Sequence, residues 1–285
     1  MPYAQTSSFV EPWLKYKTPI VRQLAFALAS PNILSRIPNE LNIQHSFNLH
    51  SNEHWLELYN NYESRLNALD LDSTELDIFL AKLKSTRLGL RFEMFFWFWL
   101  LDDKYHFYKL LAHSIQIIDG PKTVGELDFL IFNNKENRIE HWEVALKYYL
   151  AEKDLSLPFW YGLNRSDTFA RKLNHFTQKQ FQFSHALNYE ISHKFAVMKG
   201  QLFLPEHSKN NLQPNWINTN RRLGVWGTSI KDSSQDFYRL SRQEWICPHI
   251  EKSSQTALWW TDGLYLHPKT QNFYMYRNAN LLKLY

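Results

Sequence analysis

The chain has few of the residues that mark secreted, zinc-cluster or linker-rich proteins. It contains 1 cysteine, Cys247, which excludes an intramolecular disulfide and a zinc site built from several cysteines. It has 8 glycines, a low count that argues against long flexible linkers. The first residues lack the basic, apolar and small-residue order of a signal peptide. We therefore expect a cytoplasmic protein.

Long hydrophobic runs and a strong charge imbalance are also missing. The most apolar stretch, residues 87–101, is about fifteen residues long and begins with charge, so it is too short to cross a bilayer. We expect no membrane association. The net charge of +4 permits binding to nucleic acid without requiring it.

What the chain does have is enough apolar and aromatic residues, 44% and 16%, to fill a large core. We expect a mixed α/β (α+β) fold in one compact domain spanning residues 1–285. Helical patterns at residues 11–30, 51–69 and 73–83 predict a helical cap over residues 1–85. Residues 86–205 would form the core, and residues 206–285 a β-rich extension with strands near 222–230, 237–245, 264–267 and 273–277.

Residues 87–101 (RLGLRFEMFFWFWLL) are apolar almost all round, which predicts a helix buried on most of its surface. Within it, Gly89 and Glu93 are four residues apart and share a helix face. A glycine at that place would let neighbouring backbone approach the glutamate. A lone carboxylate on such a helix needs a partner.

Three strand-like segments follow, at residues 110–118, 125–132 and 138–149, separated by turn residues. Alternation along an extended chain places Glu143, Ala145 and Lys147 on one side of the third strand, opposite Val144, and Asp128 lies on the second. An acid from each of two adjacent strands and one from a packed helix suit a hard divalent ion.

We therefore expect Glu93, Asp128 and Glu143 to converge on one ion, at ligand distances of about 2.1 Å. The twelve histidines show no metal-site spacing such as HExxH.

The order of these motifs resembles the PD-(D/E)XK nuclease superfamily, closest to its RecB-like branch: GxxxE at 89–93, GxxD at 125–128, then Glu143 followed by Lys147. The segments GLRFE, GELDFLIF, HWEVALKYYL, SDTFARKLNHFTQKQF and WICP are similar to the bacterial family called domain of unknown function 1853. The resemblance runs from about Pro12 to the C-terminus. It implies a nuclease-like core sheet flanked by helices.

One residue departs from the superfamily pattern, which has a lysine two residues after the strand acid. That position is Ala145 here, and Lys147 lies about 13 Å along the strand from Glu143 at ~3.3 Å per residue. Lys147 would therefore serve the same site only if the strand bulges or twists, or if the substrate phosphate lies along it. Lys172, on the next predicted helix, is the rival.

That helix is predicted from an N-cap at Ser166 to about Phe183. Its residues Lys172, His175 and Lys179 form a basic stripe suited to phosphate contacts, although a solvated helix face has the same pattern. RecB-like nucleases place a glutamine on a helix after the lysine strand, and Gln180 matches it in position, whereas Ser184 stands where those nucleases have a tyrosine. Our candidate substrate-binding residues are Asp167, Lys172 and Gln180.

The extension is rich in tryptophans that could stack on bases or on sugars, although packing within the fold is the favoured interpretation. These residues are Trp216, Trp226, Trp245, Trp259 and Trp260.

Two functions remain open. The first is a Mg²⁺- or Mn²⁺-dependent phosphodiesterase (nuclease) acting on DNA or RNA. The candidate catalytic residues are then Glu93, Asp128, Glu143 and Lys147, with Asp128, Glu143 and Glu93 as metal ligands. The second is a catalytically inactive nuclease-like module that binds nucleic acid or protein, supported by Ala145.

Overall fold

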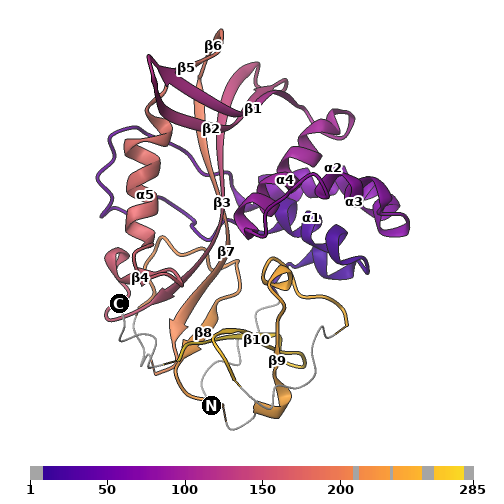
Figure 1. Ribbon diagram of the computed structural model, residues 1–285, viewed down its shortest axis with the longest axis vertical. Helices are drawn as coiled ribbons and strands as arrows, with labels where there is room; N and C mark the ends of the chain where they lie inside the picture. Colours follow the sequence, from indigo (N-terminus) through magenta and orange to yellow (C-terminus); the bar gives the residue numbers. More distant parts are fainter. Residues whose placement is uncertain (1–8, 208–211, 232–233, 252–259, 279–285) are drawn as a thin grey trace.

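The computed structural model describes residues 9–207, 212–231, 234–251 and 260–278. The fold is mixed α/β, with a large sheet between two groups of helices (Figure 1). The α-helices are α1 (Pro19–Ala29), α2 (Asn52–Leu71), α3 (Thr74–Leu80), α4 (Leu88–Leu101) and α5 (Phe169–Gln178). The longer strands are β1 (Tyr108–Asp119), β2 (Lys122–Asn133), β3 (Arg138–Ala151) and β7 (His193–Pro205). The shorter ones are β4 (Trp160–Tyr161), β5 (His185–Ala186), β6 (Tyr189–Glu190), β8 (Gly224–Gly227), β9 (Tyr238–Arg239), β10 (Gly263–His267) and β11 (Asn272–Tyr276).

The predicted strand meander is confirmed, because β1, β2 and β3 pair antiparallel in sequence order. β7 then lies parallel to β3, and the crossover between them contains β4 and α5. Among the described residues, the full order of the main sheet is β1-β2-β3-β7-β8-β11-β10-β9, with β4 on the free part of β3. The β-rich extension therefore prolongs the core sheet instead of forming a second sheet.

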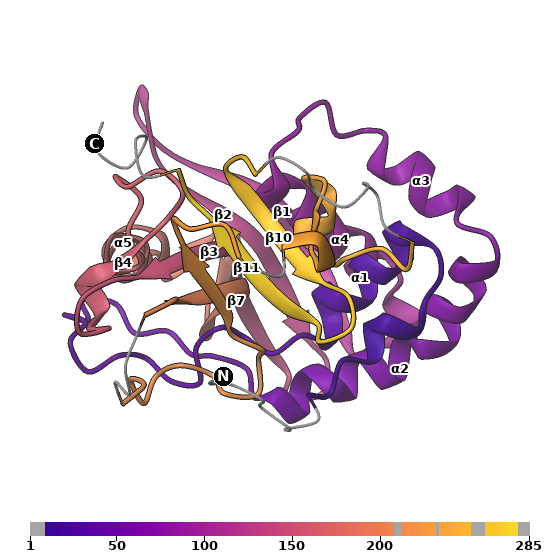
Figure 2. The same cartoon turned by 90° about the horizontal axis from the view of Figure 1, so that it is seen from below.

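The two faces of β3 pack against different helices, as strand alternation requires. Trp142 and Leu146 belong to the large core formed with α1, α2 and α4. Ala145 and Tyr149 belong to a second core that includes Phe169 and other residues of α5. Figure 2 shows the same division from below, with α5 on one side of the sheet and α1, α2 and α4 on the other. The predicted grouping of Glu143, Ala145 and Lys147 on one strand face is consistent with this packing.

Helices α2, α3 and α4 agree with the sequence patterns, whereas the helix predicted over residues 11–30 is divided into a 3-10 helix (Pro12–Lys15) and α1. Gly89 also needs a correction. A Cβ added at Gly89 would meet nothing within 4 Å, and Gly89 is exposed, so the expectation that this glycine admits a close backbone neighbour is wrong. Gly200 has such a role instead. Its φ of +127° and a Cβ position that would overlap the carbonyl of Lys147 require glycine at the pairing of β7 with β3.

Other boundaries differ from the prediction. Helix α5 is capped by Thr168, whose side chain accepts a hydrogen bond from the Arg171 N–H at 3.2 Å, and not by Ser166. α5 ends at Gln178, and a short 3-10 helix η4 (Gln180–Gln182) follows. The strand predicted over residues 237–245 is largely wrong, since only β9 forms there and residues 243–245 make a 3-10 turn.

Most tryptophans of the extension have packing roles. Trp216 and Trp260 are buried, and Trp226 and Trp245 pack against the large core, while Trp259 lies outside the described residues. No helix in the described part of the chain is both long enough and apolar enough to span a membrane.

Candidate functional site

The acids on β2 and β3 meet where the pairing of these strands ends. Their ladder runs from Asn133 opposite Arg138 to Phe129 opposite Trp142. At the next position, side chains replace the backbone pairing: Oδ2 of Asp128 accepts from the Val144 N–H at 2.8 Å, and Oε1 of Glu143 lies 3.4 Å from the Asp128 nitrogen. Asp128 and Glu143 are thus held side by side by the opening between two strands.

Glu93 approaches from α4, which packs against β1 and β3. Its Oε1 atom lies 3.5 Å from the Ser114 hydroxyl and 3.6 Å from Nε2 of His113 on β1. His113 is itself stacked on Trp97 of α4, with ring centroids 4.0 Å apart. These contacts hold the Glu93 carboxylate against the middle of β1.

The three carboxylates share one electrostatic environment. Burial raises the pKa of Asp128 well above its ordinary value, and the neighbouring charges of Glu143 and Glu93 raise it further. Burial likewise raises the pKa of Glu143 to about 8, against the opposing charge of Lys172. In the positions described, no group of three or more His, Cys, Asp or Glu side chains is arranged to hold a metal ion.

Glu143 is fully buried within a polar network that the sequence patterns did not identify. Nε2 of His141 lies 2.7 Å from its Oε1 atom, and the Gln180 amide donates to Oε2. Burial lowers the pKa of His141 to about 3, so this imidazole is neutral. His141 could have been found from the strand period, because it lies two residues before Glu143 on the same face of β3.

The two candidate lysines occupy different surroundings. Nζ of Lys147 lies 2.8 Å from Oδ2 of Asp167, whose Oδ1 accepts from the Tyr149 hydroxyl at 3.3 Å. Nζ of Lys172 donates to the Gln180 side-chain oxygen at 3.0 Å, and that same amide contacts Glu143.

The strand between Glu143 and Lys147 is regular. Its pairing with β7 continues without a register shift from Glu140 to Leu150, so no bulge brings Lys147 back towards the acids. Lys172, in contrast, interacts electrostatically with the acids. Burial lowers its pKa, and the charge of Lys147 lowers it further, while the charges of Glu143 and Asp128 oppose this by favouring the protonated amine. The structure therefore brings Lys172 and Gln180 to the carboxylates and pairs Lys147 with Asp167.

Comparison with known proteins gives a family match. The family model described as Domain of unknown function (DUF1853) matches residues 22–272. Neither the curated proteins nor the solved structures contain a match.

Proposed function

The chain belongs to the DUF1853 family, and from the geometry of the site we propose that it is a metal-dependent phosphodiesterase acting on DNA or RNA, built on a PD-(D/E)XK-like core. The observation that supports this most is the pairing of Asp128 with Glu143 at the opening between β2 and β3, with Glu93 and Lys172 near enough to interact with them electrostatically. Nucleic acid is the proposed partner.

The chemistry of these carboxylates suits a hard cation, and their side chains would have to move closer together to share one, since no three-ligand group is formed among the described residues. Asp128 and Glu143 are acids whose pKa values are raised by burial, so a divalent cation would relieve the cost of ionising them together. Asp128, Glu143 and Glu93 would hold Mg²⁺ or Mn²⁺ through carboxylate oxygens. When bound, such an ion supplies Lewis-acid polarisation of a phosphate and a more acidic water. Gln180, which now donates to Glu143, would have to release that carboxylate.

The remaining groups would act on the phosphate and the water. Lys172 is placed to neutralise charge that develops on the phosphate oxygens, because it reaches Glu143 through the Gln180 amide and interacts electrostatically with Glu143 and Asp128. Glu93, held by Ser114 and His113 at the margin of the cluster, is placed to complete the ion's ligands or to orient water. His141, two residues earlier on the same face of β3, would hold the Glu143 carboxylate in position through its hydrogen bond.

A second candidate function is a nuclease-like module that binds without hydrolysis. It is favoured by Ala145, which is buried at the position where the superfamily has its lysine, and by the pairing of Lys147 with Asp167. The two functions differ in one property, namely whether phosphodiester bonds are broken.

Cleavage assays test the proposal. We expect the wild-type protein to cut at least one of four polymers, single- or double-stranded DNA or RNA, in Mn²⁺ and not in EDTA. Asp128→Asn keeps the shape of the side chain but removes a metal-binding charge, so it should remove the activity. If the wild-type protein and Asp128→Asn are indistinguishable on all four polymers, the binding-module function replaces the nuclease.

Metal binding also has a readout that does not depend on turnover. Mn²⁺ at a hundred times its dissociation constant should stabilise the fold by about 2.7 kcal/mol, which corresponds to a rise in Tm of roughly 4 to 5 °C for a chain of 285 residues. Calorimetry or a thermal melt would measure it. Asp128→Asn should show a much smaller rise, whereas Asp103→Asn, at an exposed residue in the turn after α4, should behave like the wild type. An equal rise in all three proteins would place the ion elsewhere.

A further inference from the structure

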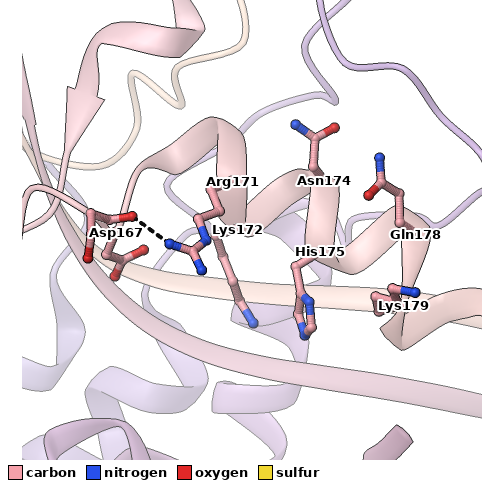
Figure 3. Close-up of a pocket in the computed structure, with 8 residues that line it drawn as sticks. Asp167, Arg171, Lys172, Asn174, His175, Gln178 and Lys179 are labelled. Atoms are coloured by element: carbon pink, nitrogen blue, oxygen red, sulfur yellow. Dashed lines mark hydrogen bonds between the residues drawn. The ribbon is translucent and has the colours of Figure 1, made fainter. Parts of the chain in front are cut away.

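A cavity of about 500 Å³ runs along the outer side of α5, and Lys172 is part of its lining. Its wall is formed by two turns of α5 together with Ser166 and Asp167, which precede the helix. The basic side chains of this wall are Arg171, Lys172, His175 and Lys179. In Figure 3, Lys172 and His175 project from one side of the helix, and Asn174 and Gln178 from another.

The cavity is strongly basic. Its acidic residue, Asp167, accepts hydrogen bonds from Lys147 and Tyr149, so its charge is already matched. The pKa of His175 is lowered, first by burial and then by the charges of Lys172, Lys179 and Arg171. The three cationic side chains Arg171, Lys172 and Lys179 on one wall give the cavity a positive potential that attracts a polyanion.

Lys172 belongs both to the cavity and to the acid cluster. It lines the cavity wall, and its ammonium also bonds to Gln180, whose amide contacts Glu143. From Arg171 to Lys179 the rise is about 12 Å. That length matches about three nucleotides of a B-form strand measured along its axis, at one phosphate per 3.4 Å.

We propose that this cavity binds the phosphates of the nucleic-acid strand that adjoin the phosphate to be cut, with Arg171 and Lys179 as backbone contacts and Lys172 between them and the reaction site. The inference rests on the proposed function for the identity of the polymer. Contacts of this kind position the strand and read no base, so the binding should be insensitive to sequence.

The test is salt-dependent binding to a fluorescein-labelled single-stranded DNA of about 20 nucleotides, a length that exceeds the site of a typical single-strand binder. Fluorescence anisotropy is measured in EDTA from about 50 to 300 mM NaCl. Arg171→Gln/Lys179→Gln should make the negative slope of log Kobs against log salt shallower by about 1.4, at 0.7 for each lost contact. If the two proteins converge at about 1 M salt, this predicts a loss of affinity of about 25-fold at 0.1 M.

The matched control is Lys84→Gln/Arg87→Gln, which removes the same charge from exposed residues between α3 and α4, on the other side of the sheet (Figure 1). It should leave the slope within about 0.3 of the wild type. An equal slope change in both double variants would overturn the inference. It would also be overturned if Arg171→Gln/Lys179→Gln lost affinity for vesicles of phosphatidylserine and phosphatidylcholine while its binding to DNA stayed unchanged. Because EDTA prevents metal-dependent cleavage, this result is independent of the nuclease assay: DNA binding through Arg171 and Lys179 without any hydrolysis would retain the cavity assignment and reject the phosphodiesterase.

Discussion

Lys172→Met is expected to lower kcat for phosphodiester cleavage by about a hundredfold or more, the scale found when one electrostatic group is removed from a transition state. The expected loss is mainly in kcat, because the charge matters most when negative charge builds up on the phosphate. Methionine keeps most of the length of the side chain beside the Phe176 ring, whose centroid lies 4.0 Å from the lysine nitrogen. Single-turnover kinetics in Mn²⁺ would measure the step itself.

Lys147→Met is the matched comparison, since it removes the same group from the position nearer to the superfamily's lysine in sequence. Its charge is paired with Asp167 on a strand that has no bulge, so we expect a loss of less than about tenfold. The Mn²⁺-dependent rise in Tm should survive both changes, because neither residue is a metal ligand. A larger loss in Lys147→Met than in Lys172→Met would return the catalytic role to Lys147.

The difference between these lysines shows what spacing alone could and could not predict. Spacing along a strand placed Glu143 and Lys147 about 13 Å apart, and the regular pairing with β7 keeps the strand extended. Whether Lys172 reaches the acids depends on the path of the crossover and on the angle at which α5 packs on the sheet. Local sequence specifies neither, because both are set by the packing of Phe169, Leu173 and their neighbours against β3 and β7.

The same division holds for the fold. The β1-β2-β3 meander and helix α4 were predictable because their apolar periods are long and are bounded by turn residues. β9 was not, since a strand of two residues depends on pairing with β10 instead of on its own pattern. Asp128 could be placed beside Glu143 from the turn between β2 and β3, but the His141 and Gln180 contacts required the assembled site.

A second large effect is expected far from the carboxylates, at Lys199 on β7. This lysine is fully buried, and its side-chain nitrogen donates a hydrogen bond to the Leu28 carbonyl at the end of α1 at 3.2 Å. It also lies 3.6 Å from the centroid of the Trp55 ring. A helix C-terminus and an aromatic face both favour a cation, but burial has the larger effect and holds the pKa of Lys199 well below its ordinary value of 10.5.

The sign of the resulting pH dependence follows from proton counting. Below pH 10.5 the unfolded chain protonates Lys199, while the folded chain keeps it neutral until the pH falls to its lowered pKa. Unfolding therefore takes up a proton in this window, and the stability that Lys199 contributes is lost as the pH falls.

We expect the free energy of unfolding of the wild type, relative to Lys199→Met, to fall by up to about 1.4 kcal/mol for each pH unit between pH 10 and the lowered pKa of Lys199. Methionine cannot titrate and retains the apolar contact with Trp55, although the Leu28 carbonyl loses its donor, a cost that is constant with pH. Urea unfolding at several pH values from about 7 to 10 would measure the difference. Lys84→Met, at an exposed position, should give a flat difference over the same range. A flat difference for Lys199→Met as well would mean that the buried amine keeps its proton, held by the α1 carbonyl and the Trp55 face more strongly than burial opposes it.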